Sequence, residues 1–243
     1  MLKEYLSRIA NAFRSVLDTS EKINAQDFPD KVSEVYEAGK QAQYDEFWDS
    51  LQRGGTEYMY YGYAFANRDI WTQENIEKVK YKNLRANYLS VMFVGNTSIT
   101  DLSMFTFESR KDQYGSTVQE GFTSTFNGCT NLVKCMPINC NMVYNFTNAF
   151  GGCTSLEELI LSGTLKRSGL DLKWSKKLSK ESIESVINVL STTASGQNVI
   201  LSQTAVDRAF ETLEGANDGS TSAEWEALAN TKMNWTITLT EVQ

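Results

Sequence analysis

The most constraining feature of the sequence is a short pattern that occurs three times between residues 89 and 161. Each copy has two apolar residues four positions apart, a glycine two residues after the second, and further apolar residues at fixed distances. The first copy contains Leu89, Phe93, Gly95, Ile99, Leu102 and Met104; the second contains Phe122, Phe126, Gly128, Cys129, Leu132 and Cys135; the third contains Phe146, Phe150, Gly152, Cys153, Leu156, Leu159 and Leu161. Phe93 and Phe126 are 33 residues apart, whereas Phe126 and Phe150 are 24 apart, so the variable length belongs in loops. A degenerate fourth copy begins at Tyr61 and includes Phe65.

Each part of the pattern predicts a local conformation. Two apolar residues four apart, such as Leu89 and Phe93, share one face of a single helical turn. The glycine that follows suits a left-handed residue where the chain leaves that turn. The alternating apolar residues Leu159 and Leu161 predict a strand with one buried face. Because a unit this short cannot bury its apolar face alone, the copies must stack.

The repeats therefore predict an α/β fold, an irregular leucine-rich-repeat solenoid with a parallel strand ribbon and short helical turns. We expect three regions: an N-terminal helical segment over 1–55, the solenoid over 56–178, and a C-terminal α/β cap over 179–243. In the cap, Ser179 is expected to begin a helix and Ser222 another, with strands at 199–201 and 235–239. The stretch from 106 to 119 fits no repeat.

The repeat box F-x-G-C-T-x-L at 126–132 and 150–156 resembles the BspA-like class of leucine-rich repeats, which occurs in bacterial surface proteins and in structural proteins of gut bacteriophages and prophages. Segments at 20–48 and 224–239 are similar to the ends of phage or prophage proteins that carry such repeats.

This resemblance implies a non-enzymatic virion protein, associated with the tail, tail tip or baseplate, that acts in assembly or host-surface attachment. Its implied partners are other virion proteins, a second copy of the chain through the N-terminal helices, or a host surface protein or glycan. The implied location is the virion, assembled in the host cytoplasm. The alternative is a bacterial protein-binding or adhesion module with no virion role, located in the cytoplasm or at the cell surface.

Charge and hydropathy limit the classes of partner and the location that we expect for the protein. A formal net charge of -7 gives no reason to expect nucleic-acid binding, which requires clustered basic residues. The basic cluster that begins at Lys166 and Arg167 is interpreted as a solvated face. No run approaches the roughly 20 apolar residues that a membrane span needs, so none is expected. Residues 1–17 mix charged with apolar positions and contain no signal core, which favours a particle assembled inside the cell.

The residue types also argue against catalysis. The sequence has no histidine, which excludes the usual nucleophile triads. The four cysteines lack the close paired spacing of zinc sites, so no metal and no cofactor are expected. Cys129 and Cys153 occupy equivalent repeat positions and are expected to stack as small buried residues. Acidic pairs such as Glu157 with Glu158 and Glu224 with Glu226 fall on segments expected to be exposed, and no catalytic residue is assigned.

An aromatic cluster between residues 58 and 65 is the candidate binding surface. It holds five large aromatic residues and a methionine, more than one strand face can bury. Aromatic residues with a polar tip are favoured at protein contacts, so Tyr58, Tyr60 and Trp71 are proposed as recognition residues. The alternative is that they pack between the N-terminal helices and the first repeat.

Overall fold

The computed structural model divides the chain into two compact units, Met1–Gly54 and Gly55–Gln243. It describes residues 30–31, 34, 59–60, 64–66, 68–69, 71–79, 82–109, 114, 116, 119–210 and 222–242. In the first unit the described residues 30, 31 and 34 are helical. The other residues of the helical segment predicted for 1–55 lie outside the described residues.

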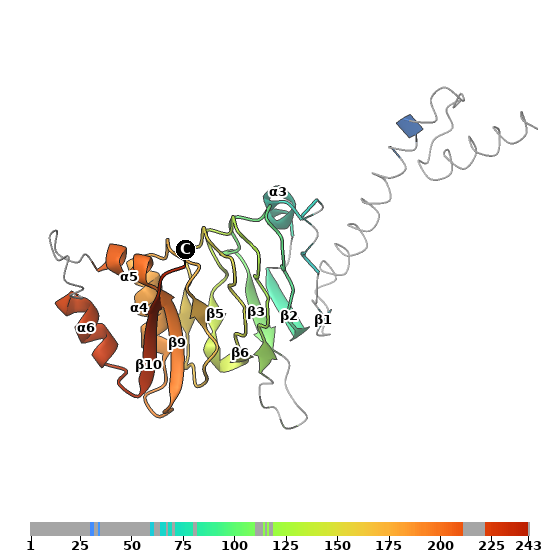
Figure 1. Cartoon of the computed structure of the whole chain (residues 1–243). Coiled ribbons are helices and arrows are strands. Elements are labelled where there is room, and N and C mark those ends of the chain that lie inside the picture. The colour runs from blue at the N-terminus through green and yellow to red at the C-terminus, as the bar shows by residue number, and fades with distance from the viewer. Residues whose placement is uncertain are drawn as a thin grey trace, which may run out of the picture. The chain divides into compact units, whose positions relative to one another are not determined.

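The second unit is built from short parallel strands and a few helices (Figure 1). Its helical elements are α3 (Gln73–Glu77), the 3-10 turn η2 (Cys140–Met142), α4 (Lys180–Val189), α5 (Gln203–Ala209) and α6 (Ala223–Asn230). Its strands are β1 (Met59–Tyr60), β2 (Asn83–Tyr88), β3 (Thr106–Ser109), β4 (Glu120–Gly121), β5 (Ile138–Asn139), β6 (Val143–Asn145), β7 (Leu161–Ser162), β8 (Asp171–Leu172), β9 (Gln197–Ser202) and β10 (Trp235–Thr240). They pair in the orders β1-β2-β3, β4-β6, β5-β7 and β10-β9-β8, and all these pairings are parallel. No described helix has the length and apolar character needed to cross a membrane.

Equivalent phenylalanines of successive copies lie in one buried column. The ring of Phe93 stacks on Phe65 on one side and on Phe126 on the other, with centroid distances of 4.9 and 5.6 Å. Phe126 stacks in turn on Phe150 at 5.3 Å, and the three interplanar angles lie between 13° and 17°. Phe122 and Phe146 form a second contact between equivalent rings at 5.7 Å. The copies therefore share one apolar interior, and the degenerate copy takes part through Phe65.

The turn between the paired apolar residues is not helical, which corrects the sequence prediction. Its central residue is left-handed in the copies that begin at Leu89, Phe122 and Phe146: φ is 56° at Val91 and 53° at both Ser124 and Asn148. The reason lies in the backbone hydrogen bonds. The amides of Val91, Phe93 and Gly95 donate to carbonyls of the next copy at 2.7 to 2.9 Å rather than to carbonyls four residues back. The amides between them close local turns, as Met92 does on Leu89.

The second copy repeats this arrangement toward the third. Amides at alternate positions of the second copy donate to carbonyls of the third at 2.7 to 3.0 Å. The donors are Phe122, Ser124, Phe126 and Gly128, and the acceptors are Asn145, Thr147, Ala149 and Gly151. Alternate amides thus bind the neighbouring copy and the others bind locally, so the backbone groups of these buried turns are satisfied without a regular strand or helix.

The glycines of the repeats also stack on one another. Gly95, Gly128 and Gly152 have φ values of 71°, 77° and 73°, the left-handed region predicted for them. A Cβ on Gly128 would lie 3.3 Å from the Cα of Gly95, so the backbones of adjacent copies approach closely at this position. Glycine is therefore needed here both for conformation and for space.

The strands are shorter than the pattern suggested. Of the strand predicted around Leu159, only β7 (Leu161–Ser162) is formed. Nearby residues form single bridges, which join Asp101 with Lys134 and Lys134 with Glu158. The stretch from 106 to 119, which fits no repeat, begins with a real strand. Its first four residues form β3 and pair in parallel with β2.

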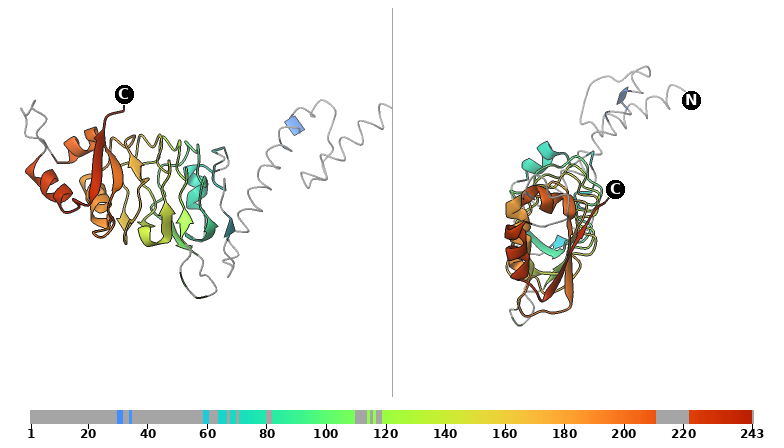
Figure 2. Two further views of the ribbon diagram at one scale, coloured as in Figure 1. Left: turned by 60° about the horizontal axis from the view of Figure 1, so that its bottom comes forward. Right: turned by 60° about the vertical axis from the view of Figure 1, so that its left-hand side comes forward.

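The C-terminal elements match the sequence prediction closely. Ser179 and Ser222 accept hydrogen bonds from the amides of Ser182 and Trp225 and so cap α4 and α6 as predicted. The predicted strands appear as β9 and β10. Helices α4 and α6 contact each other on one side of the unit, and β9 and β10 form the other (Figure 2). The residues at 56–178 and 179–243 belong to one compact unit, because β8 pairs with β9.

Helix α4 binds β7 and the residues just before it through its serines. The hydroxyl of Ser182 accepts from the amide of Leu159 at 2.9 Å and donates to the carbonyl of Glu157 at 3.0 Å. The hydroxyl of Ser185 accepts from the amide of Leu161 at 2.6 Å and donates to the carbonyl of the same residue at 3.1 Å. The helix thus supplies the donors and acceptors that a further strand would have provided.

Candidate functional site

The aromatic residues proposed for recognition do not form an exposed surface among the described residues. Trp71 is 3% exposed and packs edge-to-face on Phe65, with 4.8 Å between ring centroids. The prediction that Trp71 is a surface residue is wrong, because Trp71 covers the first ring of the phenylalanine column. Tyr60 lies in β1 and pairs with Tyr88, but its side chain is outside the described part of the chain, as is all of Tyr58.

All four cysteines are buried free thiols. As predicted, Cys129 and Cys153 take equivalent places, and their Sγ atoms donate to the carbonyls of Phe93 and Phe126 at 3.1 Å. Burial raises the pKa of Cys129 and of Cys140 to about 12, and it raises the pKa of Cys135 and Cys153 as well. These thiols stay protonated near neutral pH and are poor nucleophiles. Within the described residues, no three His, Cys, Asp or Glu side chains are placed to hold a metal ion.

In each of the acidic pairs 157/158 and 224/226, one residue lies in a surface ion pair. Glu158 pairs with Lys134 at 2.7 Å, and Glu224 pairs with Lys180 at 2.5 Å. The hydrogen bond to Glu158 raises the pKa of Lys134, and the one to Glu224 raises the pKa of Lys180. Because these carboxylates are exposed and already paired, they join neighbouring segments rather than form a reaction centre.

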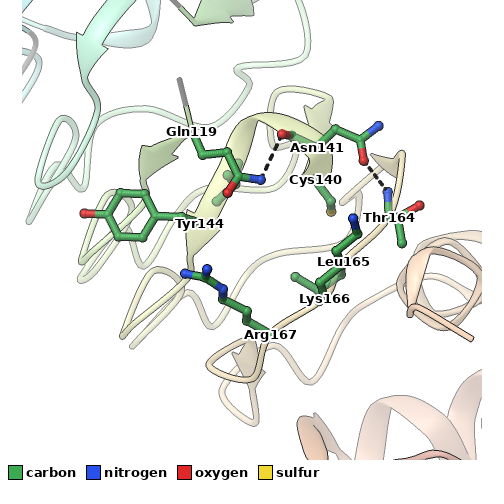
Figure 3. A pocket seen from close by; sticks show the side chains of 9 residues that line it. Gln119, Cys140, Asn141, Tyr144, Thr164, Leu165, Lys166 and Arg167 are labelled. Atoms are coloured by element: carbon green, nitrogen blue, oxygen red, sulfur yellow. Dashed lines mark hydrogen bonds between the residues drawn. The ribbon is translucent and has the colours of Figure 1, made fainter. Parts of the chain in front are cut away.

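A polar groove lies where successive turns of the chain meet beside β6 (Figure 3). Its volume is about 430 Å³. The residues that line it come from the approach to β4, from η2 and β6, and from the segment after β7. They are Gln119, Cys140, Asn141, Val143, Tyr144, Thr164, Leu165, Lys166 and Arg167.

Hydrogen bonds hold the polar wall of the groove in place. The side chain of Asn139 accepts from the amide of Asn141 at 3.0 Å and so fixes the start of η2. The carbonyl of Asn141 accepts from Nε2 of Gln119 at 3.1 Å, and its side-chain Oδ1 accepts from the amide of Thr164 at 3.1 Å. Asn141 therefore links three segments that are far apart in sequence.

Tyr144 provides the aromatic side of the groove. It follows the buried Val143 in β6, so strand alternation turns it outward, and it is 43% exposed. Its ring reaches across the neighbouring strand β4 at Gly121, where a Cβ would lie 2.8 Å from the tyrosine hydroxyl. The missing side chain at Gly121 is what leaves room for the tyrosine.

Two cations complete the groove. Lys166 and Arg167 are exposed and form no ion pair within the described part of the chain. In Figure 3 the Arg167 side chain extends on the Tyr144 side and the Lys166 amine points toward Cys140 and Asn141.

Sequence reasoning placed Lys166 and Arg167 on a solvated face and did not single out Tyr144, Asn141 or Gln119. The signal available in the sequence was Tyr144, an aromatic residue at an outward position of a strand. The register that brings it beside residues 164–167 was not readable from the sequence.

Comparison of the chain with protein-family models, with curated proteins and with solved structures gives no match. The functional assignment therefore depends on the sequence and on the geometry described above.

Proposed function

We propose that this chain is a BspA-like leucine-rich-repeat solenoid and a non-enzymatic structural protein of a phage or prophage particle. In this proposal it belongs to the tail, tail tip or baseplate and acts in assembly or host-surface attachment by binding alone. The observation that carries the proposal is the register of the copies: Phe65, Phe93, Phe126 and Phe150 stack in one column, while alternate amides bind from each copy to the next.

In such an array the interior side chains pack between the copies, and the exposed side chains remain available to bind a partner. The buried side of each copy holds apolar side chains, joined by inert thiols in the second and third copies, whereas exposed residues project from turns and strand edges. A stacked repeat thus presents an extended surface whose specificity depends on scattered exposed side chains. The assignment to a phage particle comes from the resemblance of the repeat box to repeats of phage structural proteins.

Mass spectrometry of purified particles from the source tests the proposal. We expect peptides of this chain in gradient-purified particles, in a fixed ratio to the tail proteins. A cytosolic host protein followed through the same gradient controls for carry-over. Absence of the chain from the particles would overturn the virion role and favour a bacterial interaction module with the same binding surface.

A further inference from the structure

The groove beside β6 combines three features that point to one kind of ligand. It has two cations that form no ion pair with any described residue, an outward aromatic ring, and amide groups fixed by hydrogen bonds. The two cations take no part in the packing of the copies, because both are exposed. The volume of about 430 Å³ suits a small molecule or a short segment of a polymer.

The cations indicate an anionic group on the ligand. Lys166 and Arg167 are adjacent in sequence and both line the groove, although acidic residues outnumber basic ones in the chain by 30 to 23. The guanidinium of Arg167 has the planar geometry that binds a carboxylate through two parallel hydrogen bonds. A long polyanion such as nucleic acid is disfavoured, because two cations supply little counterion release and the net charge is repulsive.

The tyrosine and the amides indicate a ring that carries hydroxyl groups. The face of an aromatic ring carries partial negative charge and attracts the C–H groups on the apolar face of a pyranose. Asn141 and Gln119 are held by their bonds to each other and to Thr164, which lowers the entropy lost when they bind hydroxyls. A bare phosphate or acetate would use the cations and leave the tyrosine and the amides without contact to the ligand.

We infer that this groove binds a carboxylate-bearing saccharide, with Arg167 and Lys166 on the carboxylate and Tyr144 against the sugar ring. The inference deepens the proposed role in surface contact and rests on it. It concerns the purified chain, however, so it can fail while the particle assignment holds, and the reverse is equally possible.

The test uses the full chain and pairs of saccharides, one with a free carboxylate and one in which the carboxylate is neutralised. Binding is measured by saturation-transfer NMR and calorimetry for 3′-sialyllactose and for trigalacturonate, each against its own neutral methyl ester. We expect at least one acidic saccharide to bind and its neutral counterpart to bind at least tenfold more weakly. Comparable binding of acidic and neutral forms, or no binding of either acid, would overturn the inference.

Matched variants locate the binding. K166Q/R167Q is expected to weaken binding of the acidic saccharide at least tenfold, and Y144A at least fivefold. The control R68Q/K177Q removes the same two charges from exposed positions outside the groove and should stay within twofold of wild type. Thermal unfolding confirms that each variant is folded. Unchanged binding in K166Q/R167Q, or inorganic phosphate competing as well as the saccharide itself, would refute a carboxylated-sugar site.

Discussion

Gly128 shows how closely adjacent copies approach one another. Its φ of 77° is strained for L-residues, and a Cβ there would lie 3.3 Å from the backbone of Gly95. Gly95 has a similar φ of 71°, but a Cβ at that position would meet nothing within 4 Å. The two glycines thus share a conformational requirement and differ in the space around them.

Substitution of these glycines by alanine distinguishes the cost of the left-handed conformation from the cost of steric contact with the adjacent copy. G95A should lose about 1–2 kcal/mol of unfolding free energy, the approximate cost of a left-handed alanine. G128A should lose more than G95A, because its methyl group meets a backbone atom that cannot rotate away. Urea denaturation measures both. Equal losses in the two variants would show that the copies separate slightly at no cost.

The buried thiols predict a loss of stability at high pH. Burial raises the pKa of Cys129 to about 12 from its ordinary value of 9.0. Above pH 9 the unfolded thiol ionises while the folded one stays protonated, so this contribution to stability is complete below pH 9 and is lost as pH rises toward 12.

This dependence is testable with Cys129→Ala. Between about pH 8 and about pH 10.5, under reducing conditions, the wild type should lose about 1–2 kcal/mol more unfolding free energy than C129A does. T130A, at the exposed next residue, serves as the control and should follow the wild type. The same pH dependence in wild type and C129A would contradict the burial of this thiol.

Among the elements, α4 shows how a helix can bind the edge of a two-stranded sheet, here β5-β7. Ser182 is fully buried, and its hydroxyl bonds both the Leu159 amide and the Glu157 carbonyl. The Glu157 carbonyl also accepts from the amide of Ser179 at 2.8 Å. An apolar residue in place of Ser182 would therefore leave the Leu159 amide without a partner, at a cost of about 1–3 kcal/mol.

Removal of this hydroxyl should therefore destabilise the fold. S182A is expected to lower the unfolding free energy by about 1–3 kcal/mol, since it leaves the amide of Leu159 unpaired. S195A removes a hydroxyl from an exposed position in the loop between α4 and β9 and should change the unfolding free energy by less than about 0.5 kcal/mol. Similar small effects for both would mean that water replaces the Ser182 hydroxyl.

The sequence predicted the elements whose signals are local. The caps Ser179 and Ser222 and the alternation of β10 depend on neighbours within a few residues, and all three were predicted. The turn at Leu89–Phe93 was predicted as helical because its spacing fits a helix equally well. Hydrogen bonds to a copy 33 residues away decide that conformation, and a local pattern does not contain them.

The candidate site was less predictable than the fold for the same reason. Asn96, at the position equivalent to Cys129 and Cys153, bonds the carbonyls of Phe65 and Trp71, and the repeat pattern does anticipate a buried side chain there. The groove, in contrast, joins Gln119, Asn141 and Lys166 from three separate segments. Its composition depends on the register between those segments.

At the scale of the whole molecule, the chain divides at Gly54, so the two units can be separated experimentally. We propose that residues 1–53 drive self-association, because they carry long apolar stripes and no repeat. The full chain should then form an oligomer in solution, and a shortened chain that starts at Thr56 should be monomeric.

Multi-angle light scattering of both chains measures this difference. A cooperative unfolding transition in the shortened chain shows that the repeats have kept their structure, which makes the comparison valid. The same subunit number for both chains would contradict a role of the first 53 residues in self-association.

The unequal spacing of the copies has a practical consequence. Phe93 and Phe126 are separated by nine more residues than Phe126 and Phe150 are, yet their ring distances of 5.6 and 5.3 Å are nearly the same. The extra residues fall between β3 and β4, where the described residue Tyr114 is exposed. Foreign peptides or affinity tags could be grafted there while the aromatic column keeps its spacing, which makes this corner a natural point of attachment for display or labelling.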